Sequence, residues 1–173
     1  IYSTYIGGQQ SDVSRGIELD GAGNVYLAGY TTSDGYPTTP GVFDRVHRGG
    51  NDLMVSKLNP SGSSLIFSTF IGGQDDDFGY SLTLDRNGNT YVTGSSESPD
   101  FPVSQGAYDT SKSGDFDAVV LKLNPTGTTL AYSTFLGGSM EDVGKSLRLD
   151  YDGNVVVAGE TFSPNLPTTP NAF

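Results

Sequence analysis

The sequence predicts an all-β protein made of tandem copies of one sheet-forming unit, and three observations support this. A heptapeptide at residues 2–8, Tyr-Ser-Thr-Tyr-Ile-Gly-Gly, returns as Phe-Ser-Thr-Phe-Ile-Gly-Gly at residues 67–73 and as Tyr-Ser-Thr-Phe-Leu-Gly-Gly at residues 132–138, so the repeat period is 67 − 2 = 132 − 67 = 65 residues without a gap. Several segments alternate apolar and polar residues as strands do, and none has the period of an amphipathic helix. Such a long period is typical of units that bury their apolar surface against neighbouring units.

The first strand of each unit follows from this alternation. Residues 16–20, Gly-Ile-Glu-Leu-Asp, alternate apolar and polar side chains. The copies at 81–85 and 146–150 keep the apolar pair, while the residue between them varies. We therefore expect Ile17 and Leu19 to face the interior of the protein.

The second strand of each unit is rich in β-branched and aromatic residues and is apolar on both faces. This pattern is typical of strands that are covered on both sides. Its copies lie at residues 25–29, 90–94 and 155–159. After a long loop, third strands are expected at 52–58 and 117–123, and fourth strands at 65–73 and 130–138.

The turns agree with this strand order. Residues 59–62 and 124–127 place Asn, Pro and Gly where a type I turn favours them, and they join the third strand to the fourth. A glycine in each of the segments 20–24, 85–89 and 150–154 supplies the positive φ that a hairpin loop needs, and these loops join the first strand to the second.

Four antiparallel strands per unit, with middle strands that are apolar on both faces, predict the blades of a β-propeller. The expected division is an orphan outer strand at residues 1–8, blade 1 at 9–73, blade 2 at 74–138 and an incomplete blade 3 at 139–173. These make about two and two-thirds repeats of 65 residues and eleven strands. Because a closed propeller needs at least about four blades, the chain is predicted to be open and not a closed ring on its own.

The repeated motifs closely resemble the SBBP repeats of secreted microbial proteins, which are believed to form β-propellers. The shared pattern is Tyr-Ser-Thr-Phe-Ile-Gly-Gly, then Leu-x-Leu-Asp-x-x-Gly-Asn, then Asp-x-x-Val-x-Lys-Leu-Asn-Pro-x-Gly, and it covers nearly the whole chain. The departures are small: Ala22, Thr90, and Asn171 in place of the glycine found at Gly41 and Gly106. The resemblance implies an extracellular or cell-surface, non-enzymatic protein and implies no particular ligand.

An open propeller has two unfinished edges, and open edges pair with other chains. Head-to-tail addition of the orphan strand of one copy to the incomplete blade of the next would give a ring or a filament. The alternatives are that the sequence is a segment of a longer chain whose further blades complete it, or that the units form a different array. The residues expected at the assembly edges are Tyr2, Thr4, Ile6, Leu147, Leu149, Val155 and Val157.

Composition excludes several kinds of site. The chain of 173 residues has no Cys and one His, which rules out thiolate nucleophiles, zinc ribbons and histidine-rich metal clusters. The net charge of −11 with no run of basic residues argues against a nucleic-acid partner. No apolar stretch approaches the roughly 18 residues of a membrane span.

Carboxylates supply the remaining candidate chemistry. Two turns have alternate oxygen-bearing residues like the start of a calcium loop, but neither has a glutamate at the twelfth position, and the first copy of the turn lacks the middle ligand. The turn itself is therefore the favoured interpretation, and no cofactor is expected apart from this weak calcium alternative. The calcium candidates are Asp85, Asn87, Asn89, Asp150, Asp152 and Asn154.

One acidic residue recurs in every unit, as Asp12, Asp77 and Asp142. A loop cap is favoured for it over ion binding, although clustered carboxylates at 75–77 could share a cation. A catalytic triad would have to use His47, whose counterpart in blade 2 is Lys112, so a surface histidine is the favoured interpretation.

The long loops carry aromatic residues in register, and packing against the blade is favoured for them over stacking on sugars. These residues are Tyr36, Phe101, Phe43, Tyr108 and Phe173. We expect an extracellular structural module that is not an enzyme and whose partners are other copies of itself or further blades of a parent chain. The alternative is a propeller module that binds carbohydrate, peptide or calcium through its loops.

Overall fold

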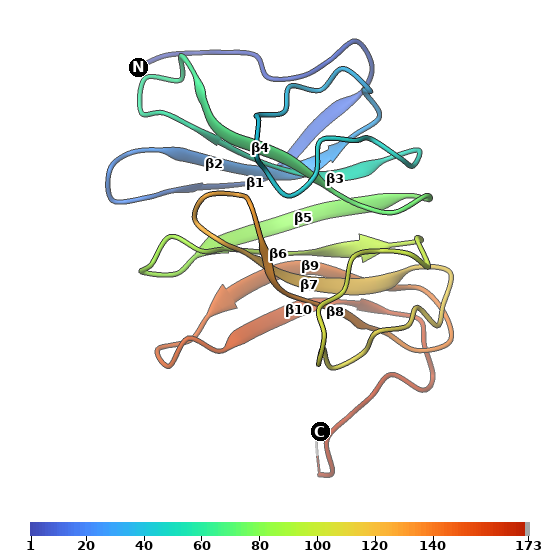
Figure 1. The fold of residues 1–173 in the computed structure, drawn as a ribbon. Coiled ribbons are helices and arrows are strands. Elements are labelled where there is room, and N and C mark those ends of the chain that lie inside the picture. Colours follow the sequence, from blue (N-terminus) through green and yellow to red (C-terminus); the bar gives the residue numbers. More distant parts are fainter. Residues whose placement is uncertain (172–173) are drawn as a thin grey trace.

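The computed structural model describes residues 1–171, which form ten β-strands in three antiparallel sheets stacked one on another (Figure 1). Within these residues there is no helix and no closed sheet, which confirms the predicted open all-β fold. Blade 1 contains β1 (Asp12–Leu19), β2 (Val25–Thr31), β3 (Asp52–Leu58) and β4 (Leu65–Ile71). Blade 2 contains β5 (Asp77–Leu84), β6 (Thr90–Ser96), β7 (Asp117–Leu123) and β8 (Leu130–Leu136), and the partial blade 3 contains β9 (Asp142–Leu149) and β10 (Val155–Thr161).

Strands follow one another in space as they do in the sequence, in the orders β1-β2-β3-β4, β5-β6-β7-β8 and β9-β10. The first strands of blades 2 and 3 pack on the preceding blade: β5 contacts β1 and β2, and β9 contacts β5 and β6. The three sheets therefore succeed one another from the N-terminal end to the C-terminal end of the molecule, as Figure 1 shows.

The first strand of each blade contains a β-bulge at the same place, between Ser14 and Gly16 in β1 and between Gly79 and Ser81 in β5. The bulge brings the backbone very close to the second strand. A Cβ on Gly94 would overlap the carbonyl oxygen of Phe78, so only glycine fits there.

Residues 1–8 do not form the predicted orphan strand, so the structure has ten strands where eleven were expected. The physical reason is the missing partner: β4 and β8 pair only with the third strand of their own blade, and residues 1–8 have no such neighbour. The segment nevertheless lies where an outer strand would lie. The ring of Tyr2 covers Gly62, just as the ring of its counterpart Phe67 covers Gly127.

The main core lies between blade 1 and blade 2. It joins one face of β2, β3 and β4 to the facing side of β5, β6, β7 and β8, and its largest fully buried side chains include Tyr26, Phe67 and Leu121. Loops reinforce this interface, since the amide of Phe43 in the long loop of blade 1 donates to the carbonyl of Gly127 in a turn of blade 2, at 2.7 Å. The stacking of blades is thus the source of most apolar burial.

Candidate functional site

The recurring aspartate caps a loop in every unit. Asp77 accepts hydrogen bonds at Oδ2 from the amide of Gly73 (2.7 Å) and the hydroxyl of Ser98 (2.8 Å), and Asp142 accepts the matching pair from Gly138 and Ser163 (2.7 Å each). Asp12 likewise accepts from the amide of Gly8 at 2.8 Å. Each carboxylate therefore ties a Gly-Gly turn to the loop after the second strand, which is the capping role favoured from the sequence.

A second set of buried carboxylates, Asp52 and Asp117, opens the third strands and was not singled out from the sequence. Asp52 accepts hydrogen bonds from the amides of Arg48 (2.9 Å) and Gly49 (3.1 Å). A Cβ on Gly72 would lie 3.0 Å from Asp52 Oδ1 and 2.8 Å from Asp77 Oδ2, so the two carboxylates are neighbours across the blade interface. The sequence feature that could have pointed to these carboxylates is the aspartate that begins both copies of the third strand.

This proximity affects the charge of Asp77. Burial, with a smaller contribution from the nearby charge of Asp52, raises its pKa to about 7, although hydrogen bonds from Gly73 and Ser98 act in the opposite direction. Burial also raises the pKa of Asp52. The Oδ1 atom of Asp77 is buried without a hydrogen-bond partner, which fits a carboxyl group that takes up a proton more readily than one in water.

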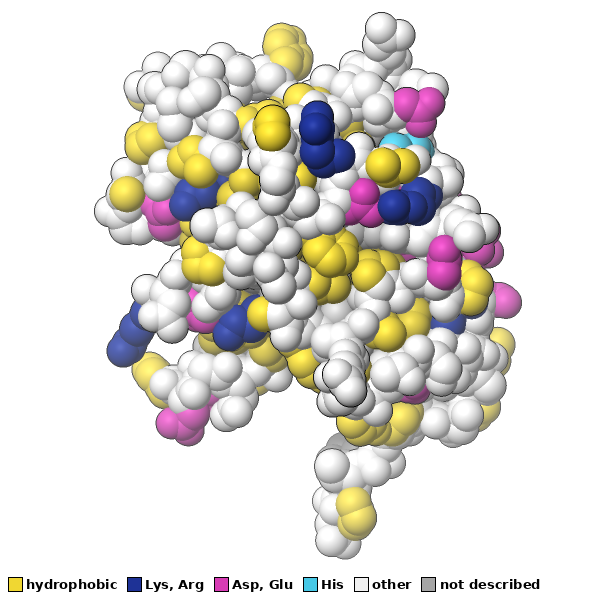
Figure 2. Space-filling view, viewed as in Figure 1, with side chains coloured by type: hydrophobic (Ala, Val, Ile, Leu, Met, Phe, Trp, Pro, Cys, Tyr) yellow, Lys and Arg dark blue, Asp and Glu magenta, His cyan; other side chains and the backbone are white. Residues whose placement is uncertain are grey.

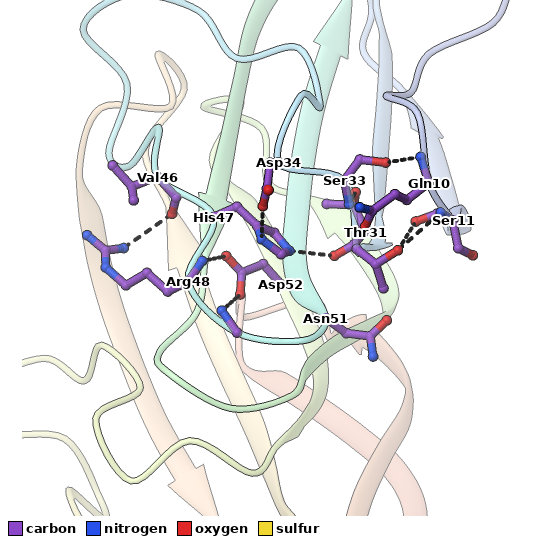
Figure 3. A network of polar contacts seen from close by, with 12 residues as sticks. Gln10, Ser11, Thr31, Ser33, Asp34, Val46, His47, Arg48, Asn51 and Asp52 are labelled. Carbon is purple, nitrogen blue, oxygen red and sulfur yellow. Dashed lines mark hydrogen bonds and ion pairs between the residues drawn. The ribbon is translucent and has the colours of Figure 1, made fainter.

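His47 is held in a polar network between Asp34 and Thr31 (Figure 3). Its Nε2 lies 3.1 Å from the carbonyl oxygen of Thr31 and its Nδ1 lies 3.0 Å from the carboxylate of Asp34. The ring also packs edge-on against Phe70, with 5.7 Å between the centroids. The histidine is therefore mostly buried, unlike the surface histidine expected, and both of its nitrogens already face acceptors.

The calcium candidates lie in the turns that join first and second strands. Asp85 Oδ1 accepts from the amides of Asn87 and Asn89, and its Oδ2 accepts from the side-chain amide of Asn89 at 2.7 Å. Asp150 makes the matching contacts with Asp152 and Asn154. Asn89 and Asn154 thus turn their NH2 groups, and not their oxygens, toward the carboxylate. Within residues 1–171 no three acidic or histidine side chains come together to hold a metal ion.

These turns contain an ion pair that the sequence analysis missed. Lys57 Nζ lies 3.2 Å from Asp20 Oδ2 and 4.6 Å from the ring centroid of Tyr26, and Lys122 lies 3.5 Å from Asp85 and 4.8 Å from the ring centroid of Tyr91. Burial opposes the charge of Asp20, but hydrogen bonds from Asn24 and Lys57 outweigh it and lower the pKa to about 2. The sequence feature that could have pointed to this ion pair is the lysine that both third strands carry at their sixth position.

The aromatic residues of the long loops separate into buried and exposed ones. Tyr36 and Phe101 are buried, the first with its hydroxyl 3.1 Å from that of Ser56 and the second against Phe135. Phe43 packs on the main core, and Tyr108 is exposed. The aromatic prediction for Phe173 lies outside the described residues. Packing, as favoured from the sequence, thus accounts for three of them.

The two ends of the stack expose positions that are buried between blades. Leu82 is 2% exposed and Leu147 is 1% exposed, but their counterpart Ile17 is 67% exposed. The expectation that Ile17 and Leu19 face the interior is therefore wrong for blade 1, because no blade lies against β1 on that side. The N-terminal end of the stack is an uncovered apolar face.

The predicted edge residues fall into three groups. Tyr2 and Thr4 are exposed and Ile6 is half-buried against the cluster around Phe70, while Leu149, Val155 and Val157 are half-buried. The assignment of Leu147 to an open edge is wrong: β9 presents it to blade 2, where its amide lies 3.4 Å from the hydroxyl of Ser81. On β10 the large exposed apolar side chain is Val156.

Two apolar hollows adjoin β10. The first, of about 150 Å³, is lined by residues that include Ala118, Leu136, Val157 and Gly159. The second, of about 340 Å³, is lined by Tyr108, Val120, Tyr132, Thr134, Leu136, Val155 and Val157. Both hollows lie beside β10, where blades 1 and 2 have their third and fourth strands.

The surface offers no dominant charged patch on the face shown in Figure 2, where acidic and basic side chains are interspersed and hydrophobic ones are scattered. No helix among the described residues is long and apolar enough to cross a membrane.

Comparison with known proteins agrees with the geometry. A search of curated proteins gave no match. A family model described as SBBP, Beta-propeller repeat, matches residues 1–37 and 66–102. The matched stretches start one period apart, 66 − 1 = 65 residues, and each ends in the loop after a second strand. These two stretches of the chain thus match the β-propeller repeat of this family.

Proposed function

We propose that the chain is a structural β-propeller module, extracellular and without enzymatic activity, whose uncovered ends are completed head-to-tail by further blades. The observation that carries the proposal is the contrast between Ile17, which is exposed, and its counterparts Leu82 and Leu147, which are buried between blades. Burying one such side chain stabilises an interface by about 1.5–3 kcal/mol. The end faces therefore favour contact with another blade.

The further blades have two sources, other copies of the chain or additional repeats of a longer one. Different surfaces meet in a head-to-tail contact, so successive copies give a ring if the rotation closes and a filament if it does not. The end faces have the same chemistry in both cases, because every blade repeats the same sequence pattern.

The extracellular location rests on the likeness of the repeated motifs to repeats of secreted proteins. The lack of enzymatic activity is supported by His47, whose two ring nitrogens are engaged by Asp34 and Thr31. The carboxylates of the repeated turns are engaged within the turns themselves.

Light scattering over a range of concentrations, with electron microscopy, tests the proposal. Self-association that grows with concentration and is lost in Ile17→Asp would support completion by other copies. Ile66→Asp is the matched control, because Ile66 is also exposed. Its counterpart in blade 2, Ala131, stays exposed although blade 1 packs on that side of blade 2, so a neighbouring blade should not cover Ile66 either. A monomer at all concentrations, with no rise in stability when a further blade is added to the sequence, would contradict the proposal.

A further inference from the structure

We propose that a row of aromatic side chains on blades 1 and 2 binds a neutral saccharide chain. The row consists of Tyr30, Phe78, Tyr80 and Phe116, and a basic side chain lies at each of its two ends. We call this row the aromatic platform. Its binding activity is additional to the structural role proposed above, and it needs no further blade, because it lies where the described blades already pack on one another.

The four rings contact one another across the interface between the two blades. Tyr30 of β2 meets Phe78 of β5 edge to face, with 4.8 Å between the ring centroids. The ring of Phe78 is within 14° of parallel to that of Tyr80, at 6.1 Å, and it lies 6.0 Å from that of Phe116, the residue before β7. All four residues are half-buried, so part of this aromatic surface is open to solvent.

The basic side chains come from the first strands on either side. Cζ of Arg15 in β1 lies 5.7 Å from the ring centroid of Tyr30, and Nη2 of Arg15 donates a hydrogen bond to the hydroxyl of Tyr30 at 3.2 Å. Nζ of Lys145 in β9 lies 5.0 Å from the ring centroid of Tyr80 and 3.2 Å from a carboxylate oxygen of Glu160. The platform therefore combines apolar ring surface with a few polar groups, as ligand sites do.

The β-bulges of the first strands place three of these residues at the surface. Arg15, Tyr80 and Lys145 are the extra residues of the bulges in β1, β5 and β9, and the pairing with the second strand skips each of them. Tyr80 is half-buried and Lys145 is exposed, although a preceding blade packs on both of their strands. A bulge redirects a side chain in this way, so the bulge position is accessible in the stacked blades.

Packing between blades does not require the platform. The repeat has Val13 and Val143 at the position of Phe78, and Ser95 at the position of Tyr30. At the interface between blades 2 and 3, Ser95 and Val143 are 2% and 4% exposed, so these smaller side chains are enough to close it. The aromatic residues between blades 1 and 2 leave ring surface exposed at the same place, which favours a role in binding over a role in packing.

Charge restricts the class of ligand. The net charge of −11 repels polyanions, which disfavours nucleic acids and acidic polysaccharides. Arg15 and Lys145 repel a cationic ligand at the platform itself. A neutral ligand meets neither kind of repulsion.

Among neutral ligands, a saccharide chain fits the platform better than a peptide. A pyranose ring has a face of C–H groups that can stack on Phe78 and Tyr80. Its hydroxyl groups can accept hydrogen bonds from Arg15 and Lys145 and donate to Glu160. Because the two stacked rings are nearly parallel, the platform suits an extended chain of equatorially linked sugars, whose faces are flat. A peptide needs a regular strand edge or a groove, and the bulge interrupts the edge of β5.

Isothermal titration calorimetry of the full chain with four probes tests the proposal. Cellohexaose, which is neutral and extended, should bind. Maltohexaose, which is coiled, hexagalacturonate, which is anionic, and a decaproline peptide should each bind at least about tenfold more weakly. Saturation-transfer NMR should show that C–H protons of the bound cellohexaose lie close to aromatic protons of the protein.

The repeat itself supplies substitutions that suit the fold. Phe78→Val and Tyr80→Lys introduce the residues that blade 3 has at the same positions, and each should weaken cellohexaose binding by about tenfold. Tyr151→Arg introduces the residue of blade 2 at an exposed position in the turn after β9. It is the matched control and should leave binding unchanged. Melting curves check that the three variants are folded.

Absence of cellohexaose binding by the unchanged chain would overturn the proposal. Equal affinity of the unchanged chain and of both platform variants would do the same, because the sugar would then bind elsewhere. Tighter binding of any other probe than of cellohexaose would assign the platform to a different class of ligand. None of these results bears on completion of the stack by further blades, which the light-scattering experiment tests separately.

Discussion

The interface between blades 1 and 2 and the two ends of the stack have nearly the same sequence but opposite environments. Leu82 is buried where β5 meets blade 1, and Ile17 is exposed where β1 meets no blade. Phe67 is covered by blade 2, and Tyr132 is partly exposed beside β10. Burial in this protein is therefore decided by the neighbouring blade and not by the residue itself, as expected of repeat architectures.

The largest expected effect comes from truncating the same position in the two environments. Leu82→Ala removes a side chain that is fully enclosed, so it should lower the free energy of unfolding by about 2–5 kcal/mol. Ile17→Ala removes a mostly exposed one and should cost less than about 1 kcal/mol. Urea denaturation followed by circular dichroism measures both. An equal loss of unfolding free energy in the two variants would contradict the claim that the neighbouring blade decides burial.

A smaller effect is expected from pH, through the carboxylates at the interface. The pKa of Asp77 is raised to about 7 by burial, so the folded protein holds a proton that the unfolded chain releases near pH 4. The stabilisation is complete below the unfolded pKa and is lost as pH rises toward 7. Asp52 shifts in the same direction. The melting temperature should therefore be higher at pH 5 than at pH 7.5.

The variant Asp77→Asn isolates this contribution. Because asparagine does not titrate, the difference in melting temperature between pH 5 and pH 7.5 should shrink. Asp12→Asn, at the matching position of the uncovered end, serves as the control for lost capping hydrogen bonds. If the melting temperature of Asp77→Asn still differs between pH 5 and pH 7.5 as it does in the unchanged protein, the pH dependence belongs to other groups.

The smallest effect is expected from the lysines of the third strands. Lys122→Met removes an ion pair with Asp85 and a contact with the ring of Tyr91, and should cost about 0.5–1.5 kcal/mol. Lys145→Met is the matched control, because Lys145 has a similar pairing with Glu160 and Tyr80 at a more exposed site. Thermal unfolding at low and high salt would show whether the half-buried Lys122–Asp85 pair contributes more than the more exposed Lys145–Glu160 pair.

Much of the fold was predictable because turn residues and apolar runs recur at the same positions of every repeat and mark where the strands begin and end. The third strand was predicted at residues 52–58 and is found at Asp52–Leu58, since its turn and its apolar run both bound it. The first strand was predicted to begin at Gly16 but begins at Asp12, because the bulge before Gly16 interrupts the alternation. Asn171 has φ of 65°, close to the 80° of Gly41, so its replacement of that glycine preserves the turn.

The candidate site was less predictable, because it depends on contacts between units. The capping role of Asp77 follows from its recurrence within the sequence, but its proximity to Asp52 arises only when β5 packs on blade 1. Leu147 was assigned to an open edge because it belongs to the incomplete blade. Its strand nevertheless lies against blade 2, so only the far side of that blade is uncovered.

The hydrogen bond from Phe43 to Gly127 spans 84 residues and joins a loop of one sheet to a turn of the next. Because the acceptor belongs to a turn of blade 2, this contact of the long loop of blade 1 is absent from any fragment that ends before that turn. A fragment that keeps this contact should accordingly contain one whole sheet together with the turns of the next sheet. Cutting the chain between the two sheets would separate the amide of Phe43 from the carbonyl of Gly127.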